Sequence, residues 1–346
     1  MKYDILTFGS VTLDVLLKLQ AGESITLSEC QNEASMTLPL GDKIPIQDAL
    51  MLCGGGASNS ATGFTKLGFS TAAVGVIGDD VNSHFVLDIL KQQQINTDYL
   101  ITEPGQSCSL SVILSDWTGG RTVLHKRLIS EHFTSAIIDG LPDSQAFYIG
   151  HLQQNANEIL HALAAKYTDE ERLIGWNPGK TQFQHGFDEY RDVFPLVDML
   201  ILNAEEARDF TGLPFDVLSV EEAKPEHYGE PVVGGDYATK PVTCITDVRR
   251  LADKFLQAGV EIVCITDGCR GAQIFDGKHH YWAPPIDVEV TDSLGAGDAF
   301  SVGLISAKLH GKDLATQILW GSLSSASVIQ HYGAQAGQLL LDQMPA

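Results

Sequence analysis

Short apolar runs of strand length alternate with helical patterns along most of this chain. The runs with strand character are Ile5–Phe8, Ala72–Ile77, Ala146–Ile149, Leu173–Trp176, Met199–Leu202 and Ile262–Thr266. Helical patterns such as Ala57–Leu67 and Val81–Gln93 lie between them. This alternation predicts an α/β fold with a mostly parallel sheet and helices on both of its faces. Ligands of such folds bind at the carboxyl ends of the strands, so polar residues that follow a strand are candidate site residues.

Three segments depart from this alternation. Residues 11–53 contain the extended pieces Val11–Leu19 and Met36–Leu40, and residues 98–128 contain Tyr99–Thr102, Ser109–Leu114 and Thr122–Leu124. We expect these two segments to form one small sheet at an edge of the core, as a lid over a site. Residues 214–245 are rich in Pro, Gly and acidic residues, which predicts an inserted, exposed loop. The whole chain, 1–346, is expected to be one domain.

The charge balance narrows the classes of partner. A formal net charge of −22, from 22 basic and 44 acidic residues, argues against a nucleic-acid or anionic-membrane binder. Because the net charge is negative, an anionic substrate must be bound by local positive groups: helix N-termini, a few basic side chains and a divalent metal. The six cysteines are scattered without metal-site spacing, and no run approaches 18 apolar residues. The N-terminus does not read as a signal peptide, so we expect a cytoplasmic protein with reduced cysteines.

The stretch Val290–Phe300 points to phosphate chemistry. Gly295 and Gly297 allow an anion to approach the backbone closely, and the apolar run that follows predicts a helix whose free N–H groups would hold it. Asp298 lies on the first turn of that helix, where its charge would repel the anion. A carboxylate there makes sense if it takes a proton from a hydroxyl that attacks phosphorus. The alternative is a first-turn acid that only stabilises the helix.

Two further polar positions suit the recognition of hydroxyl groups. The cluster Gly54–Asn59 opens a predicted helix, and an amide such as that of Asn59 both donates and accepts hydrogen bonds. Asp14 follows the first strand and can accept hydrogen bonds from two hydroxyls of a polyol. The alternatives are a capped helix start for the cluster and a solvated turn acid for Asp14.

Residues after two later strands suit a nucleotide and its metal. Asn203 and Glu206 follow the strand Met199–Leu202, and their oxygens could hold Mg²⁺ directly or through water. The alternative is a capping box. Thr266 and the turn with Gly268 and Gly271 could line a nucleotide pocket, or form a simple turn between strands.

Taken in order, these motifs resemble those of the ribokinase/PfkB family of carbohydrate kinases. The resemblance covers most of the chain, and Gly-Ala-Gly-Asp, residues 295–298, is its most specific motif. It implies a ribokinase-like three-layer α/β/α core with a small β-sheet lid, and ATP and Mg²⁺ as cofactors. It also implies a site in which Asp298 is the base, the Gly295, Ala296 and Gly297 amides form the anion hole, and Asp14, Gly55 and Asn59 hold the sugar hydroxyls.

The resemblance implies further roles around the nucleotide. Asn203 and Glu206 would lie near magnesium and the phosphates, with Asn177 a weaker match in the same region. Thr266, Gly268 and Gly271 would border the nucleotide. Because family members often bind a monovalent cation near the position of Asp292, a K⁺ ion is a candidate here. Homodimerisation through the lid is a further expectation.

Two departures from the family pattern bear on specificity. Leu294 stands where the family usually has Thr or Asn, which removes a hydroxyl or amide but leaves the backbone anion hole intact. Gly56 stands where several members have lysine, which favours a neutral or weakly acidic polyol over a substrate that already carries phosphate.

The sequence therefore predicts an ATP-dependent kinase that phosphorylates a hydroxyl of a free sugar or sugar acid. A nucleoside kinase is the alternative within the family, with Phe133, Trp117 or Tyr99 as walls for the base. A catalytically silent relative that only binds a sugar or nucleotide is the alternative from another class. Asp298 argues against it, because a mere binder gains nothing from an acid that faces phosphate.

Overall fold

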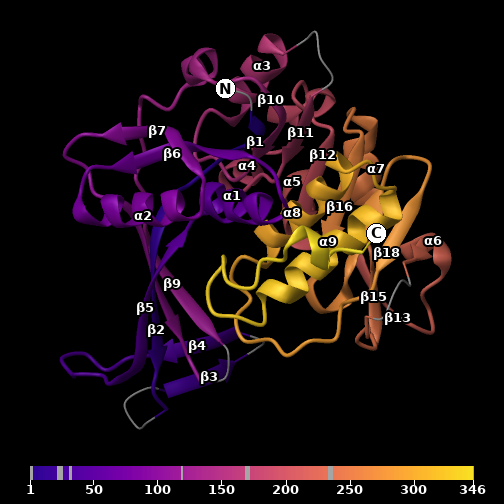
Figure 1. Cartoon of the computed structure of the whole chain (residues 1–346). Helices are drawn as coiled ribbons and strands as arrows, with labels where there is room; N and C mark the ends of the chain where they lie inside the picture. The colour runs from indigo at the N-terminus through magenta and orange to yellow at the C-terminus, as the bar shows by residue number, and fades with distance from the viewer. Residues whose placement is uncertain are drawn as a thin grey trace.

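A large mixed sheet forms the centre of the molecule (Figure 1). The computed structural model describes residues 3–21, 26–30, 33–117, 120–167, 172–232 and 237–345. In spatial order the strands are β14 (Glu230–Pro231), β18 (His280–Ala283), β17 (Ala272–Phe275), β16 (Ile262–Thr266), β12 (Met199–Asn203), β11 (Leu173–Trp176), β10 (Ser144–Ile149), β1 (Tyr3–Phe8), β6 (Thr71–Gly78) and β7 (Asn96–Glu103). From β16 to β7 every neighbouring pair is parallel, whereas β17 and β18 are antiparallel additions at one edge.

Helices cover both faces of this sheet. The apolar cluster on one face includes residues of α1 (Gly56–Lys66), α8 (Ala296–Leu309) and α9 (Leu314–Val328). The cluster on the other face includes α3 (Ala156–Lys166), α5 (Ala204–Thr211) and α7 (Arg249–Gln257), with α4 (Lys180–His185) packed against α5. Helix α2 (Val81–Gln92) packs on β7 and on the smaller sheet described below. The 3₁₀ turns are η1 (Ser135–Gly140), η2 (Phe187–Tyr190), η3 (Phe194–Leu196), η4 (Gly268–Arg270) and η5 (Leu341–Gln343).

The central strands are apolar on both sides because both sides are covered. In β1, Ile5 packs into the cluster with α1, α8 and α9, whereas its neighbours Leu6 and Phe8 pack into the opposite cluster. All three side chains are fully buried. This explains the continuous apolar runs in the sequence. The predicted three-layer α/β core is confirmed, and each of the six predicted core strands is present.

A second sheet of four strands projects from the core at the lower left of Figure 1. Its order is β5 (Ile46–Gly54), β2 (Thr12–Leu19), β8 (Ser109–Ser115) and β9 (Arg121–Lys126). Strand β2 pairs antiparallel with β5 and parallel with β8, and β8 pairs antiparallel with β9. We call it the four-stranded sheet.

Two pieces expected in this small sheet lie elsewhere. The piece Tyr99–Thr102 belongs to β7 at the edge of the main sheet, because its residues pair with β6. The piece Met36–Leu40 is only partly a strand: β4 (Glu33–Thr37) pairs with β3 (Thr26–Cys30) alone, and Leu40 is fully exposed. The fourth strand is β5 instead, which the sequence did not suggest because its first half is exposed and carries no apolar alternation.

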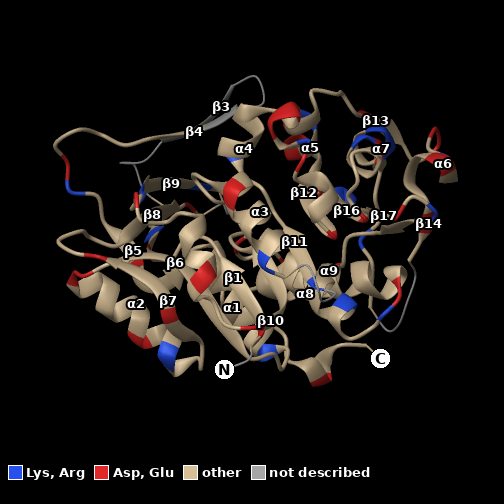
Figure 2. Ribbon diagram, turned by 90° about the horizontal axis from the view of Figure 1, so that it is seen from above, with Lys and Arg blue, Asp and Glu red and all other residues tan. Residues whose placement is uncertain are grey.

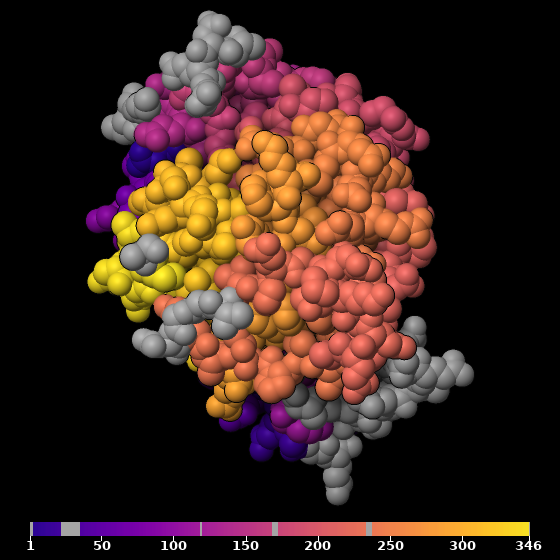
Figure 3. All heavy atoms as spheres, turned by 90° about the vertical axis from the view of Figure 1, so that its right-hand side faces the viewer, coloured from indigo at the N-terminus to yellow at the C-terminus, as the bar shows by residue number. Residues whose placement is uncertain are grey.

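The segment 214–245 has more structure than the loop expected from its composition. Strand β13 (Asp216–Ser219) pairs with β15 (Cys244–Asp247), α6 (Pro225–Tyr228) follows, and β14 extends the main sheet by pairing with β18. The segment contributes to the face of the molecule in Figure 3, beside the orange and yellow C-terminal part. Residues 233–236 lie outside the described part of the chain.

Acidic residues are spread over many elements in Figure 2, in keeping with the excess of 44 acidic over 22 basic residues. Within the described ranges, the structure contains no helix that is both long enough and apolar enough to cross a bilayer.

Candidate functional site

Two cavities meet at the first turn of α8. The carboxylate cavity, about 710 Å³ and open to solvent, is lined among others by Asp14, Gly55, Asn59, Gly295 and Asp298. The helix-start cavity, about 610 Å³, is lined among others by Thr266, Gly268, Gly271, Ala296 and Gly297. The structure thus brings most of the residues singled out in the sequence to two adjoining hollows. The α8 start forms a wall of both.

Asp298 is partly buried on the carboxylate-cavity side of this helix start. Its Oδ2 accepts a hydrogen bond of 2.8 Å from Asn59 Nδ2. Burial raises the pKa of Asp298 to about 6, and the Asn59 amide opposes this rise by stabilising the charged form. The side chain is therefore mostly ionised at pH 7 and still basic enough to accept a proton.

The two glycines beside Asp298, Gly295 and Gly297, differ in backbone conformation and in the space that surrounds them. Gly295 has φ of +78°, and a Cβ there would come within 2.4 Å of the Ala334 Cβ. Gly297 has ordinary helical geometry, and a Cβ there would meet no described protein atom within 4 Å. The space in front of Gly297 is open, and the N–H groups of a first helical turn lack partners within the helix. The Ala296 N–H has only a long bond of 3.4 Å to the Ser293 carbonyl. This combination suits an anion.

Asp14 lies in β2 and its residue is only 6% exposed. Burial raises its pKa to about 6; a hydrogen bond with Ser111 lowers it, and the charges of Asp298 and Asp292 raise it further. Gly54 lies against the Asp14 carboxylate, because a Cβ at that position would come within 1.9 Å of Asp14 Oδ2. The chain therefore accepts an unfavourable buried carboxylate here, which indicates a functional role.

Strand register adds residues that sequence reasoning missed. Asp14 pairs across the four-stranded sheet with Ser111, and Ser111 pairs with His125, so the three side chains share one face. His125 and Arg127 both line the carboxylate cavity. No motif marks these residues, since their position depends on the pairing of β2, β8 and β9.

Arg121 connects the four-stranded sheet to the core. Its Nη1 donates to Asp292 Oδ1 at 3.0 Å and to Ser293 Oγ at 2.6 Å. The Asp292 carboxylate also accepts from the backbone N–H groups of Leu294 and Gly333. Both carboxylate oxygens thus have hydrogen-bond partners, and a potassium ion at Asp292 stays a prediction from the resemblance.

Asn203 and Glu206 form a reciprocal capping box at the start of α5. Asn203 Oδ1 accepts from the Glu206 N–H at 2.8 Å, and Glu206 Oε2 accepts from the Asn203 N–H at 2.9 Å. Asn203 pairs with Thr266 across β12 and β16, which places the box beside the helix-start cavity. Asn177 donates to the Ile201 carbonyl, and neither it nor Asn203 nor Glu206 lines either cavity.

The capping box leaves one carboxylate oxygen for a metal. Glu206 Oε2 is used by the cap, and burial raises the pKa of the side chain. The part of the chain that the structure describes has no cluster of three or more His, Cys, Asp or Glu side chains able to hold a metal ion. Mg²⁺ commonly binds through one or two carboxylates, several waters and substrate phosphates. Glu206 therefore fits a magnesium ion that a nucleotide brings, and does not by itself form a metal site.

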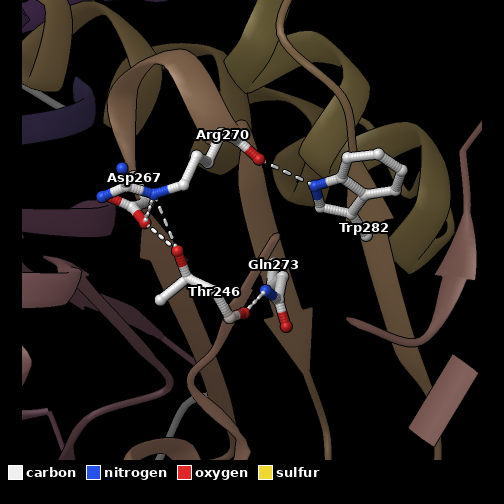
Figure 4. Close-up of polar contacts among 5 residues, drawn as sticks. All are labelled: Thr246, Asp267, Arg270, Gln273 and Trp282. Carbon is white, nitrogen blue, oxygen red and sulfur yellow. Dashed lines mark hydrogen bonds and ion pairs between the residues drawn. The ribbon is translucent and has the colours of Figure 1, made fainter. Parts of the chain in front are cut away.

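A polar network fixes the turn after β16 (Figure 4). The Arg270 guanidinium donates to both Asp267 oxygens, at 2.7 and 2.8 Å, and to Thr246 Oγ1 at 2.9 Å. The Thr246 hydroxyl bonds to Asp267, and the Thr246 carbonyl accepts from Gln273 Nε2. Trp282 Nε1 donates to the Arg270 carbonyl at 3.0 Å. These bonds tie the turn to β15 and to β18, and Gln273 ties β15 to β17.

The fixed turn presents its glycines to the helix-start cavity. Gly271 has φ of +90°, and a Cβ there would come within 2.2 Å of the Ala283 carbonyl oxygen. Gly268 has φ of +49°, and a Cβ there would meet nothing within 4 Å. The turn thus offers backbone rather than side chains to a ligand, as a flat group such as a nucleobase needs.

Comparisons with known proteins agree with this geometry. The sequence profile of the pfkB family carbohydrate kinases matches residues 32–340. An uncharacterized sugar kinase from Archaeoglobus fulgidus is 24% identical over 279 residues, covering 80% of this chain and 97% of that protein.

Two solved structures share the fold. The structure of a nucleoside kinase from Burkholderia thailandensis in complex with inosine gives a TM-score of 0.70 at 19% identity, covering 98% of this chain and 96% of that chain. The structure of Arabidopsis thaliana ribokinase complexed with ribose and ATP gives a TM-score of 0.70 at 16% identity, covering 99% and 98%. With the family profile spanning most of its length, this chain belongs to the pfkB family of carbohydrate kinases and is an ATP-dependent kinase of that family.

Proposed function

We propose that the protein transfers the γ-phosphoryl group of ATP to a hydroxyl of a free sugar or sugar acid. The observation that carries this proposal is the α8 start, which separates a cavity with two carboxylates from a cavity with a backbone-lined turn. The sugar would bind in the carboxylate cavity at Asp14, Gly55 and Asn59. The nucleotide would bind in the helix-start cavity.

In this arrangement Asp298 takes the proton from the attacking hydroxyl. The Gly295, Ala296 and Gly297 amides would hold the transferring phosphoryl group, where the positive end of the helix dipole favours the developing charge. Asn203, Thr266, Gly268 and Gly271 would border the nucleotide, and Glu206 would hold Mg²⁺ through its free oxygen or through water. The metal would neutralise charge on the phosphates. Potassium takes no part in the proposed reaction.

Replacement of Gly297 by alanine separates the fold from the proposed anion hole. Because the new methyl group would meet no described protein atom, we expect stability within about 0.5 kcal/mol of wild type. The methyl group would occupy the space of the phosphoryl group, so we expect kcat to fall by about a hundredfold, as for loss of one oxyanion donor. Thermal unfolding and steady-state kinetics measure the two effects. Unchanged kcat in Gly297→Ala would place the anion elsewhere.

Within the sugar class, Arg127 in the lining of the carboxylate cavity favours a sugar acid. Arg127 lines the carboxylate cavity, and its Nη1 lies 3.4 Å from His151 Nδ1. Burial and the neighbouring guanidinium lower the pKa of His151 to about 4, so the imidazole is neutral at pH 7. Among the described residues, the guanidinium of Arg127 contacts the neutral His151 imidazole and forms no ion pair with a carboxylate. A substrate carboxylate would supply one.

An adjoining hollow keeps the nucleoside alternative open. The side cavity, about 510 Å³, shares Ser10 and Ser109 with the carboxylate cavity and includes Phe133, Val76 and Leu128. Of the three aromatic residues considered from sequence, Phe133 lines it and Trp117 and Tyr99 do not. A base attached to a sugar at Asp14 could extend into this space.

A substrate panel tests the proposal. Purified protein with Mg²⁺ and ATP would be assayed for ADP release with ribose, fructose, 2-keto-3-deoxygluconate, adenosine, cytidine and inosine. Turnover of a sugar acid, with a KM raised at least tenfold in Arg127→Met, supports the leading proposal. Turnover of nucleosides alone supports the alternative. ATP binding without turnover of any polyol in a broad panel favours a catalytically silent relative.

We also propose that the four-stranded sheet is a lid and that two copies associate through it. Its side facing away from Asp14 carries a cross-strand row of apolar residues, Met51, Val15, Val112 and Leu124. Leu124 is 57% exposed and Met51 51%. An exposed apolar row is stabilised when another apolar surface covers it, and the same row on a second copy of the chain would provide that surface.

Sedimentation velocity tests this association. We expect a dimer at micromolar concentration, and a monomer for Leu124→Glu because a charge would be buried in the contact. Leu40→Glu, a change at a fully exposed leucine outside the sheet, is the matched control and should stay dimeric. A monomeric wild type would contradict the association.

The free cysteines among the described residues fit a reducing compartment, and we propose a cytoplasmic location.

A further inference from the structure

A row of side-chain amides connects the Asp298 carboxylate to residues far from it in sequence. Asn59 Nδ2 donates to Asp298 Oδ2 at 2.8 Å, and Asn59 Oδ1 accepts from Gln335 Nε2 at 3.3 Å. Gln335 Oε1 accepts from Gln93 Nε2 at 3.0 Å, and Gln93 Oε1 lies 2.8 Å from Thr62 Oγ1. We call this row the amide chain. It joins α1, the end of α2, the C-terminal loop and α8.

The charge on Asp298 sets the direction of every bond in the amide chain. An ionised carboxylate only accepts hydrogen bonds, so Asn59 must present its NH₂ group to it and its carbonyl to Gln335. Gln335 must then donate to Asn59 and accept from Gln93. At the far end, the single hydroxyl hydrogen of Thr62 lies between Gln93 Oε1 and the Ser58 carbonyl, each at 2.8 Å. A reversed Asn59 amide would place two acceptors together.

Asn59 alone cannot secure this orientation. Its residue is 5% exposed, and its carbonyl oxygen points away from Asp298 to Gln335. Without a donor there, a buried amide oxygen would lack a partner, which is unfavourable. Rotation of the amide, or a shift toward another donor, would relieve that cost and weaken the bond to Asp298.

We propose that Gln335, supported by Gln93, is a positioning residue for the base. Neither glutamine lines the carboxylate cavity or the helix-start cavity. Both line a separate hollow of about 600 Å³ with Met51 and Tyr332. They act on Asp298 only through Asn59. This proposal rests on the proposed role of Asp298 as base and adds residues outside the family motifs.

The titrating neighbours of Asp298 must be separated from this effect. Asp14 faces it from β2, and the buried Tyr148 lies near it on β10. The Cys53 thiol lies near Gln335, and burial raises its pKa to about 11, so it stays neutral in the assay range. None of these groups is changed in Gln335→Met or Gln93→Met, so a pKa shift in those two variants reports on the amide chain, whereas Gln335→Glu adds a charge of its own.

Two replacements of Gln335 test the proposal. Gln335→Met keeps the length of the side chain and removes both hydrogen bonds. Gln335→Glu keeps the shape but turns the donor toward Asn59 into an acceptor. We expect kcat to fall about tenfold in both, with KM for ATP unchanged, because small errors in the position of a base are costly. The acid limb of the kcat profile should move to higher pH, since a weaker Asn59 bond raises the pKa of Asp298.

A smaller change in the same direction is expected for Gln93→Met, which removes the support of Gln335 alone. Gln317→Met is the matched control, because that buried amide donates to the Lys312 carbonyl and lines neither the carboxylate cavity nor the helix-start cavity. A second readout needs no substrate: the ¹³C-carboxyl titration of Asp298, assigned by its loss in Asp298→Asn, should also move to higher pH in Gln335→Met.

The outcomes separate the two proposals. A kcat within twofold of wild type and an unmoved Asp298 titration in both Gln335 variants would overturn the positioning role. A rise in KM alone would overturn it as well. If Asp298→Asn turns over like wild type, the proposed base is wrong, and the Asp298 titration then decides the amide chain alone.

Discussion

Asp298→Asn is expected to lose kcat by about a thousandfold and at the same time to stabilise the fold. The first effect follows from loss of the general base, which contributes about 10²–10⁴-fold to rates. The second follows from the raised pKa. Because the folded-state pKa is about 6, above the ordinary 3.8, the ionised carboxylate opposes folding at pH above 6. Partial exposure of the side chain limits the gain to about 1 kcal/mol.

The sign of the stability change distinguishes the base from a helix-stabilising acid. A first-turn acid would lose about 0.3–1 kcal/mol with its charge. For Asp298 we expect the gain at pH 7 and its progressive loss as the pH falls through 6, so that most of it is gone at pH 4, close to the unfolded-state pKa of 3.8. Asp313→Asn is the control: Asp313 caps α9 through the Thr316 N–H, and asparagine caps equally well. Thermal melts at pH 4 and 7 with ATP-consumption assays measure both effects. Near wild-type turnover, or lower stability at pH 7, would contradict the proposed base.

Much of the fold could be predicted from the sequence because local patterns decide it. Strands such as β1 and β10 are buried on both faces and therefore have unbroken apolar runs. Strand β5 could not be predicted, since its first half is exposed and its place depends on pairing with β2. The prediction that Tyr99–Thr102 belongs to the small sheet was wrong for a related reason. An extended piece does not indicate which sheet it joins.

The residues of the candidate site likewise fall into those that could be predicted from the sequence and those that could not. Gly295 and Asp298 could be found because they are contiguous with a helix start, where geometry and chemistry follow from neighbours in sequence. His125 and Gln335 could not, since one reaches the site through strand register and the other through a side-chain contact 276 residues from Asn59. The structure also adds a constraint on Asn203 and Glu206, whose oxygens are largely used in a capping box.

Asp14→Ala is expected to reduce kcat/KM for the polyol by at least about a hundredfold, with KM for ATP unchanged. A carboxylate that accepts two hydroxyl hydrogen bonds contributes about 1.5–3 kcal/mol for each. The loss of both corresponds to a factor of 100 or more. The methyl group of alanine makes no clash, since Asp14 faces Gly54 and the open cavity. Asp48→Ala, which removes an exposed aspartate of the same sheet, is the control and should have wild-type kinetics.

The pH dependence of polyol binding tests whether the Asp14 carboxylate makes these bonds in its ionised form. With a pKa of about 6, Asp14 loses the capacity to accept two hydrogen bonds as the pH falls below 6, so KM for the polyol should rise there. That rise should be absent in Asp14→Ala. In Asp298→Asn the midpoint of polyol binding, measured by calorimetry, should move to lower pH, because one of the charges that raise the pKa of Asp14 is gone. A midpoint that does not move would show that the charge of Asp298 does not act on Asp14 in the cavity. Residues other than Asp14 would then have to hold the sugar beside the base.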